Sequence, residues 1–117
     1  MTIFGIKNCD TIKKSLKWFE ARGVAHQFHD FRKQGLEREL LERWVRELGV
    51  EVLLNKRGTT WRKLPDDQKE NLDQAAIIDL LLDKPAMIKR PVIDFGSTRR
   101  VGFSKKDQDE IAALLGC

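Results

Sequence analysis

The sequence predicts an α/β fold with a mixed four-stranded sheet, in the order β-α-β, helical insert, β-β-α. Three observations lead to this prediction. The first 31 residues show a strand-helix-strand pattern, about residues 35–84 show helical patterns, and a hairpin with a closing helix follows Pro85. We expect a single domain over residues 1–117, with a core formed by residues 1–34 and 85–117 and a helical lobe inserted at about residues 35–84.

The N-terminal pattern is typical of a βαβ unit, whose two strands pair in parallel through a right-handed crossover. The segment Thr2–Ile6 predicts a short buried strand, and Val24–Phe31 predicts a second strand near the sheet edge. A helix is expected over Thr11–Arg22, capped by Asp10 and stopped by Gly23. Its buried stripe consists of Ile12, Leu16 and Phe19.

The middle of the chain is mostly helical. One apolar stripe predicts a helix that ends at Gly49, and this stripe consists of Leu36, Leu40, Leu41, Trp44, Val45 and Leu48. The polar, turn-rich segment Asn55–Thr60 predicts a loop. Pro65 is placed to open a short helix, and Asp73–Leu82 predicts the most apolar helix of the chain.

The α/β pattern resumes after this apolar helix. Pro91 interrupts a strand-like run over residues 87–93, so it fits an edge, a bulge or the start of a strand. A turn then leads into Arg99–Phe103, which makes a hairpin the economical interpretation. Ser104 is placed to cap the last helix, with Asp107 in a capping-box position. The residues of that helix expected to face the core are Ile111, Leu114 and Leu115.

Composition excludes several classes of protein. With 117 residues, 41% hydrophobic and 34% charged, the chain is long and apolar enough for one folded core. It has no apolar run near the ~20 residues of a membrane span and no signal-peptide pattern, so we expect a cytoplasmic protein. The net charge of +4 comes from interspersed charges of both signs, so we expect no direct contact with nucleic acid.

Cysteines and histidines are few. Cys9 and Cys117 stand at opposite ends of the chain, which is too few for a disulfide framework, and neither belongs to a cluster with zinc-ligand spacing. His26 and His29, three residues apart on a predicted strand, point to opposite faces of it. We therefore expect no metal site.

Cys9 is the strongest functional candidate because it lies in the turn before the first predicted helix. There the helix dipole, together with Lys7 and Lys13, favours the thiolate, whereas Asp10 opposes it. Such a position lowers a thiol pKa from about 8.5 toward ~3.5–7.5. Position alone leaves two interpretations open, a reactive thiolate and an inert, small apolar residue.

Other candidates have two interpretations each. Ile12 stands where a CxxC motif has its second thiol, and Cys117 is either a resolving thiol or a terminal thiol without a role. Arg90 is either an anion ligand or a solvated surface residue, and its bond to Pro91 is trans by default. The loop Asn55–Thr60 offers an amide, two cations and two hydroxyls, which suits an anionic ligand but is also ordinary loop composition.

Four segments together resemble a known family: IFGIKNCDT, LLNKRGTTWRKL, KRPV and TRRVGFS. Along nearly its whole length, the chain resembles the arsenate reductase-related (ArsC/Spx) branch of the thioredoxin-fold proteins, and most closely its YffB-like members. The resemblance implies a thioredoxin-like fold with a helical insert. It also implies that Cys9 is the nucleophile and that the bond between Arg90 and Pro91 is cis.

Two departures from the family pattern limit what the resemblance implies. Arsenate reductases of the family surround the cysteine with three arginines, but only Arg90 matches here, since Asn55 and Gly102 stand at the other two positions. The arginines close in sequence to those two positions are Arg57, Arg99 and Arg100. The loss of charge-assisted bonds argues against efficient arsenate reduction. Ile12 likewise removes the CxxC switch that Spx-type regulators usually carry.

The resemblance implies a glutathione-dependent thiol reductase with no bound cofactor and with glutathione as co-substrate. Cys9 forms a mixed disulfide with glutathione, and a second glutathione releases it. Lys7, Asn8 and the helix N–H groups stabilise the thiolate, while the backbone beside Pro91 pairs with the glutathione peptide. The residues expected to bind glutathione or substrate, beside the catalytic pair Cys9 and Arg90, are Lys7, Asn8, Lys13, Asn55, Lys56, Arg57, Pro91 and Arg99.

The expected partner of such a reductase is a disulfide or oxidised-thiol substrate, with glutaredoxin as a further partner. Two alternatives stay open. The first is a regulator without enzymatic activity that docks on a partner such as RNA polymerase, as Spx-type members do. The second is a weak arsenate reductase. The resemblance does not separate these functions, because one fold hosts several of them.

Overall fold

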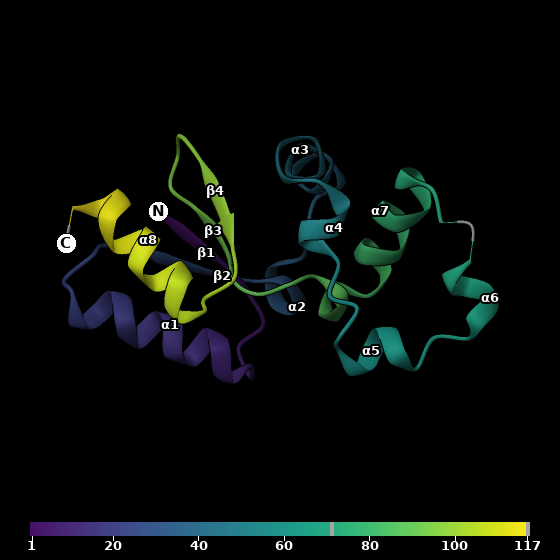
Figure 1. Cartoon of the computed structure of the whole chain (residues 1–117), viewed down its shortest axis with the longest axis horizontal. Coiled ribbons are helices and arrows are strands. Elements are labelled where there is room, and N and C mark those ends of the chain that lie inside the picture. Colours follow the sequence, from purple (N-terminus) through teal and green to yellow (C-terminus); the bar gives the residue numbers. More distant parts are fainter. Residues whose placement is uncertain (71, 117) are drawn as a thin grey trace. The chain divides into compact units, whose positions relative to one another are not determined.

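The computed structural model describes residues 1–70 and 72–116 and has the predicted mixed four-stranded sheet (Figure 1). The strands, in the spatial order β2-β1-β3-β4, are β1 (Thr2–Gly5), β2 (Gln27–Asp30), β3 (Val92–Asp94) and β4 (Arg99–Val101). β1 pairs in parallel with β2 and antiparallel with β3, and β3 forms an antiparallel hairpin with β4. The predicted βαβ unit, the C-terminal hairpin and the edge position of the second strand are confirmed.

Two compact units make up the chain. The first, which we call the sheet unit, consists of Met1–Asp30 and Arg90–Cys117. The second, the helical unit, consists of Phe31–Lys89. The helical unit contains the whole of segment 35–84, which the sequence marks as an insert, and extends beyond it at both ends.

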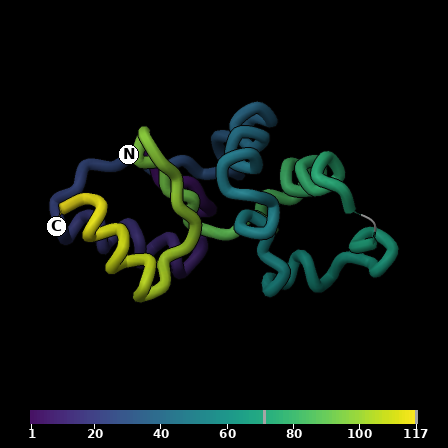
Figure 2. Tube along the Cα trace, turned by 45° about the horizontal axis from the view of Figure 1, so that its top comes forward, coloured from purple at the N-terminus to yellow at the C-terminus, as the bar shows by residue number. Residues whose placement is uncertain are grey.

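In the sheet unit, α1 (Asp10–Ala21) and α8 (Lys105–Leu115) lie side by side along the sheet, in the view of Figure 1 and in the turned view of Figure 2. The rings of Trp18 and Phe103 meet edge to face, with 5.6 Å between their centroids. The buried core consists of Ile3, Phe19, Ile93, Phe103 and Ile111. Burial of this apolar surface holds α1, and with it the turn before α1, against the sheet.

Gly5 allows α1 to pack directly on the end of β1. A Cβ atom at Gly5 would lie 2.2 Å from the Cδ1 of Ile12 and 2.8 Å from its Cγ1, and Ile12 is fully buried. We predict that Gly5→Ala lowers the free energy of unfolding by about 1–3 kcal/mol through overpacking, as measured by denaturant titration. Because Ile12→Val removes Cδ1, the double variant should recover part of this loss, and simple addition of the two losses would contradict the contact.

The helical unit is built from short helices around its own core. They are α2 (Phe31–Gln34), α3 (Arg38–Leu48), α4 (Val50–Leu53), α5 (Thr59–Arg62), α6 (Asp66–Lys69), α7 (Gln74–Asp83) and the 3₁₀ helix η1 (Pro85–Met87). The fully buried core residues include Trp44, Leu41, Leu53, Leu81 and Ile88. Leu54 and Ile88 form an isolated antiparallel bridge, and the N–H of Lys89 donates to the carbonyl of Leu53 at 2.7 Å.

The second strand is shorter than the predicted Val24–Phe31. Gly23, with φ 67°, ends the first helix as predicted, and the Val24 N–H donates back to the carbonyl of Phe19 at 3.1 Å. The backbone N–H of Val24 is therefore used at the end of α1, and β2 starts only at Gln27. At the other end, Phe31 begins α2 and is buried. Competition for the same backbone groups shortens the strand at both ends.

Three further predictions are wrong. Thr59 and Thr60, predicted as loop, begin α5. Met87, predicted within a strand-like run, ends η1, because Pro85 is well suited to open a helical turn. Leu114, predicted to face the core, is 52% exposed, because α8 contacts the core through Ile111.

The predicted helix boundaries elsewhere are confirmed within a residue or two. The Ser104 hydroxyl accepts the N–H of Asp107 at 3.2 Å, and the Asp107 carboxylate accepts the N–H of Ser104 at 2.9 Å, which completes the predicted capping box. α3 ends at Gly49 with φ 89°, α6 follows Pro65, and Asp73 caps α7.

Candidate active site

Cys9 lies in the turn between β1 and α1 and is itself the N-cap of the helix. Its backbone is extended (φ −104°, ψ 128°), and its carbonyl accepts the N–H of Lys13 at 3.0 Å. The predicted cap, Asp10, is instead the first helical residue, so that prediction is wrong by one position. This position places the half-buried Cys9 side chain at the positive end of the α1 dipole.

Asp30 supports this turn from the neighbouring strand. It ends β2, pairs in register with Gly5 at the end of β1, and is buried. Its carboxylate accepts the N–H of Lys7 at 3.4 Å. The sequence prediction treated Asp30 only as a strand residue. An acidic residue ending a strand parallel to β1 was the available signal, because the carboxyl ends of parallel strands meet at one edge.

Arg90 and Pro91 approach the turn from the other side of β1. The bond between them is cis, as the resemblance implies. Val92 pairs with Phe4 in the register of β3 and β1, so Pro91 lies at the end of β1 from which the Cys9 turn departs. Arg90 is thereby brought to Cys9, and its guanidinium forms a hydrogen bond with the sulfur.

These contacts decide the ionisation of Cys9. Burial, the largest single effect, raises the pKa of the Cys9 thiol. The N–H of Ile12, the charge of Arg90, the N–H of Thr11 and the hydrogen bond from Arg90 together outweigh burial and lower the pKa. N–H donors and a cation both stabilise a negatively charged sulfur more than a neutral one, so these groups favour the thiolate.

The other predicted residues of the sheet unit are placed differently. Lys7, Asn8 and Lys13 are exposed around the turn. Arg90 is the cation whose charge lowers the pKa of the Cys9 thiol, and the roles of Lys7 and Lys13 stay predictions. Arg99 pairs with Asp94, and Asp94 pairs with Thr2 in the sheet, so Arg99 lies at the opposite end of β1 from Cys9.

Gly102, which stands where the resemblance places a third arginine, has a backbone that disfavours one. Its φ is 101°, and a Cβ there would lie 2.8 Å from Oδ2 of Asp107. The Asp107 carboxylate already takes part in the capping box of α8 and forms an ion pair with Arg100 at 3.6 Å. An arginine at position 102 would therefore strain the backbone and displace this carboxylate.

The helical unit contains a cationic pocket. Its volume is about 430 Å³, and it is lined by Glu51, Leu54, Asn55, Lys56, Arg57 and Lys89. The Asn55 side chain accepts the N–H of Arg57 at 3.1 Å, which shapes the loop. Three of the predicted binding residues, Asn55, Lys56 and Arg57, are thus gathered in one pocket with a further cation, Lys89.

Ile12, at the position of the second thiol of a CxxC motif, is a fully buried core residue. Cys117 lies outside the residues that the structure describes. Within residues 1–70 and 72–116, no group of three or more histidine, cysteine, aspartate or glutamate side chains is placed to hold a metal ion. Over the same part of the chain, no helix has the length and apolar character of a membrane span.

A mixed sheet of this order, a cysteine at the N-terminus of the helix after the first strand, and a cis-proline before the third strand define a thioredoxin-like protein. The chain belongs to the ArsC family, whose sequence model matches residues 4–111.

Relatives support this assignment. A Haemophilus influenzae protein described as uncharacterised is 41% identical over 107 residues, which span 92% of this chain and 94% of that protein. A solved structure of a YffB protein is 46% identical with a TM-score of 0.90 and covers 97% of both chains. The solution structure of an ArsC-related protein from Brucella melitensis is 43% identical with a TM-score of 0.78, covering 99% of this chain and 94% of that one.

The chain is also similar to a regulator. The global transcriptional regulator Spx of Streptococcus mutans is 28% identical over 117 residues, which span 98% of this chain and 82% of that protein.

Proposed function

We propose that the chain is a glutathione-dependent thiol reductase in which Cys9 is the single nucleophile. One observation carries the proposal: the N–H groups at the start of α1 and the Arg90 guanidinium together lower the Cys9 pKa. A thiolate is the nucleophile in disulfide exchange, so this environment suits that chemistry. The buried Ile12 occupies the position of a second thiol, which favours an external thiol as the resolving group.

The cycle consists of two exchanges. In the first, the Cys9 thiolate attacks the glutathione sulfur of a substrate mixed disulfide, the substrate S–S bond breaks, and the substrate thiolate leaves and takes a proton from water. Cys9 is then joined to glutathione. In the second exchange, the thiolate of a free glutathione attacks this disulfide, which yields oxidised glutathione and restores the Cys9 thiolate. In total, one free glutathione thiol is oxidised for each substrate thiol released, because the other glutathione enters the cycle already in the mixed disulfide.

The cationic pocket of the helical unit supports glutathione as the co-substrate. Glutathione carries two carboxylates, and the pocket offers Lys56, Arg57 and Lys89 against one acid, Glu51. We propose that Lys56 and Arg57 bind a glutathione carboxylate, with the Asn55 amide as a further donor.

We predict that Arg57→Gln raises the KM for glutathione about two- to fivefold with a smaller change in kcat, as expected for loss of an exposed ion pair. Steady-state kinetics with varied glutathione measure both constants. Arg62→Gln is the matched control, because Arg62 is an exposed arginine on α5 that does not line the pocket. Equal KM values for Arg57→Gln and wild type would show that the pocket does not bind glutathione.

Two measurements test the proposed function as a whole. Intact-mass spectrometry after treatment with oxidised glutathione should show one glutathione on the chain, mapped to Cys9 by peptide analysis. Turnover of a glutathione mixed disulfide should then consume reduced glutathione and produce oxidised glutathione in a one-to-one ratio with substrate. An adduct at Cys9 without turnover would reject the reductase.

The similarity to Spx favours a second candidate, a regulator that binds a protein partner. This candidate predicts capture of RNA polymerase subunits by the purified chain, with the same yield for wild type and Cys9→Ser. The reductase predicts no such capture and a turnover that depends on Cys9. The two experiments together separate the candidates.

A further inference from the structure

The exposed surface of α1 and of the turn before it carries four lysines, and Asp10 is the acid in the first turn of the helix. We use the name lysine patch for Lys7, Lys13, Lys14 and Lys17, which are all exposed. None of the four forms an ion pair with a residue that the structure describes. On the adjacent α8, by contrast, Lys105 pairs with Asp109 at 2.9 Å.

The lysine patch works against the stability of its own helix. Lys13 and Lys17 are four residues apart on α1, where like charges repel each other across one turn. Lys13 and Lys14 also lie in the N-terminal half of α1, at the positive end of its dipole, where cations are unfavourable. Asp10, three and four residues before Lys13 and Lys14, offsets part of this cost, but none of the four lysines forms an ion pair with it, so their ammonium groups are open to an acidic partner.

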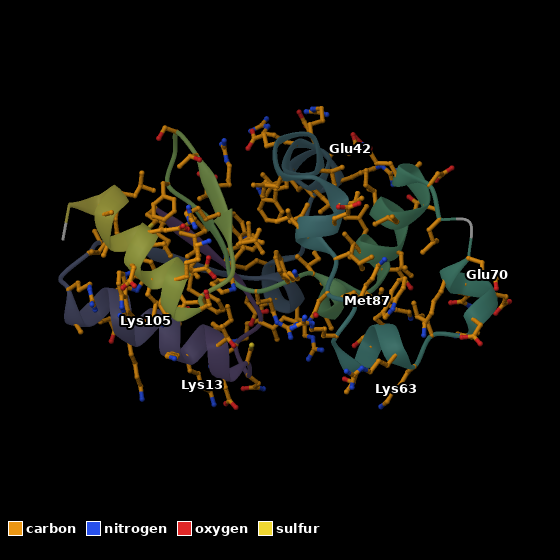
Figure 3. The ribbon with its side chains drawn as sticks, in the orientation of Figure 1. Lys13, Glu42, Lys63, Glu70, Met87 and Lys105 are labelled. Carbon is orange, nitrogen blue, oxygen red and sulfur yellow. The ribbon has the colours of Figure 1, made fainter. Side chains whose placement is uncertain are left out.

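Two lysines of the patch lie close to Cys9 in the chain. Lys7 lies two residues before Cys9, and Lys13 lies four residues after it, on the same side of α1. Because Cα–Cβ bonds on a helix tilt toward its N-terminus, the side chains of Lys13 and Lys14 lean toward the end of α1 at which Cys9 lies. Figure 3 labels Lys13 on α1, on the side of the helix away from the sheet.

We propose that the lysine patch docks an acidic segment of a protein whose cysteine is held as a mixed disulfide with glutathione. This proposal rests on the proposed function and deepens it, because it assigns the class of substrate. Opposite charge steers the acidic segment to α1 and raises the rate of encounter with Cys9. In the docked complex, Cys9 takes the glutathione, the substrate cysteine leaves as a thiolate and gains a proton from water, and free glutathione then resolves Cys9.

A protein fits this surface better than a nucleic acid does. The lysine patch adjoins a thiol whose exchange chemistry needs a sulfur atom on the partner, and nucleic acids have none in a disulfide. Binding of single strands also uses aromatic side chains among the cations for base stacking. The aromatic residues of α1, Trp18 and Phe19, pack in the core of the sheet unit instead.

The test compares two synthetic peptides, each with one cysteine as a glutathione mixed disulfide, flanked by glutamates in one and by serines in the other. The readout is the ratio of kcat/KM for the acidic peptide to that for the neutral peptide. We expect a ratio of about 10 in wild type at about 0.01 M salt and near one at about 1 M salt, where charges are screened within about 3 Å.

The patch variant combines Lys13→Gln, Lys14→Gln and Lys17→Gln, and its ratio should be near one at low salt. The matched control combines Lys33→Gln, Lys63→Gln and Lys84→Gln, which remove the same charge from the helical unit and should leave the ratio as in wild type. A wild-type ratio near one, or equal losses in both triple variants, would overturn the proposal.

A binding measurement keeps the two proposals apart. The fluorescence anisotropy of a labelled acidic peptide with serine in place of cysteine reports docking without chemistry. Turnover of both peptides at equal rates would overturn the proposal that the lysine patch docks the substrate, while the proposed reductase activity would stand. Patch-dependent peptide binding without turnover of either peptide would keep the surface as an acidic-peptide site and reject the reductase. Tighter binding of a single-stranded oligonucleotide of equal charge would overturn the assignment to an acidic protein.

Discussion

Cys9→Ser is expected to reduce turnover of glutathione mixed disulfides to the uncatalysed rate. Serine cannot form the disulfide with glutathione on which the proposed cycle depends, and its hydroxyl does not ionise in the pH range where a thiol does. The loss should be complete rather than partial, because Ile12 stands at the position of a second thiol in a CxxC motif and is buried. Steady-state turnover and the mass of the glutathione adduct measure the effect.

The same substitution controls for folding. Cys9 is the N-cap of α1, and serine is among the preferred N-cap residues, so at a pH low enough to protonate Cys9 the free energy of unfolding should be unchanged or raised by up to about 1 kcal/mol. A denaturant titration of Cys9→Ser therefore separates lost chemistry from lost structure. Turnover at the wild-type rate by a folded Cys9→Ser protein would reject Cys9 as the nucleophile.

Arg90→Gln is expected to raise the pKa of the Cys9 thiol and to slow the reaction at neutral pH about tenfold. The sign follows from the contact: the Arg90 charge and hydrogen bond favour the thiolate, so their loss favours the protonated, unreactive thiol. The acid limb of the pH–rate profile should therefore move to higher pH, and the rates of variant and wild type should converge above the raised pKa. The rate of iodoacetamide alkylation as a function of pH measures the pKa directly.

Arg99→Gln is the matched control for Arg90→Gln. Arg99 belongs to the same unit and is also partly buried, but it pairs with Asp94 at the opposite end of β1 from Cys9. Loss of the Arg99 guanidinium should change the free energy of unfolding. It should leave the pH dependence of Cys9 alkylation the same as in wild type. If both variants move the profile equally, the effect comes from the net charge of the unit and not from the contact with Cys9.

The lowered pKa of Cys9 also predicts a pH dependence of stability. The folded protein binds the thiol proton less tightly than the unfolded chain, whose thiol pKa is about 8.5. The thiolate therefore contributes stability fully above about pH 8.5, and this contribution is lost as the pH falls through the lowered pKa of the folded state. The difference in unfolding free energy between wild type and Cys9→Ser should rise with pH across this window.

Local sequence signals predicted much of the fold. Alternation and apolar stripes placed the four strands and the main helices, and Gly23, Gly49 and Ser104 marked helix boundaries that the structure confirms. These signals are reliable because a helix end is decided by a few neighbouring residues. The errors fall where two local structures compete for one segment, as at Val24, which serves the end of α1 and not the strand.

By itself, the sequence determined that Cys9 stands at the start of a helix, since the turn and the helix are local features. Which charged groups lie next to Cys9 is decided only by the tertiary structure. The sheet places β1 between β2 and β3, and this order brings Asp30 under the turn and Arg90 to the sulfur, while it carries Arg99 to the far end of β1. Strand order and register depend on burial of apolar faces across the whole sheet, so no local pattern contains them.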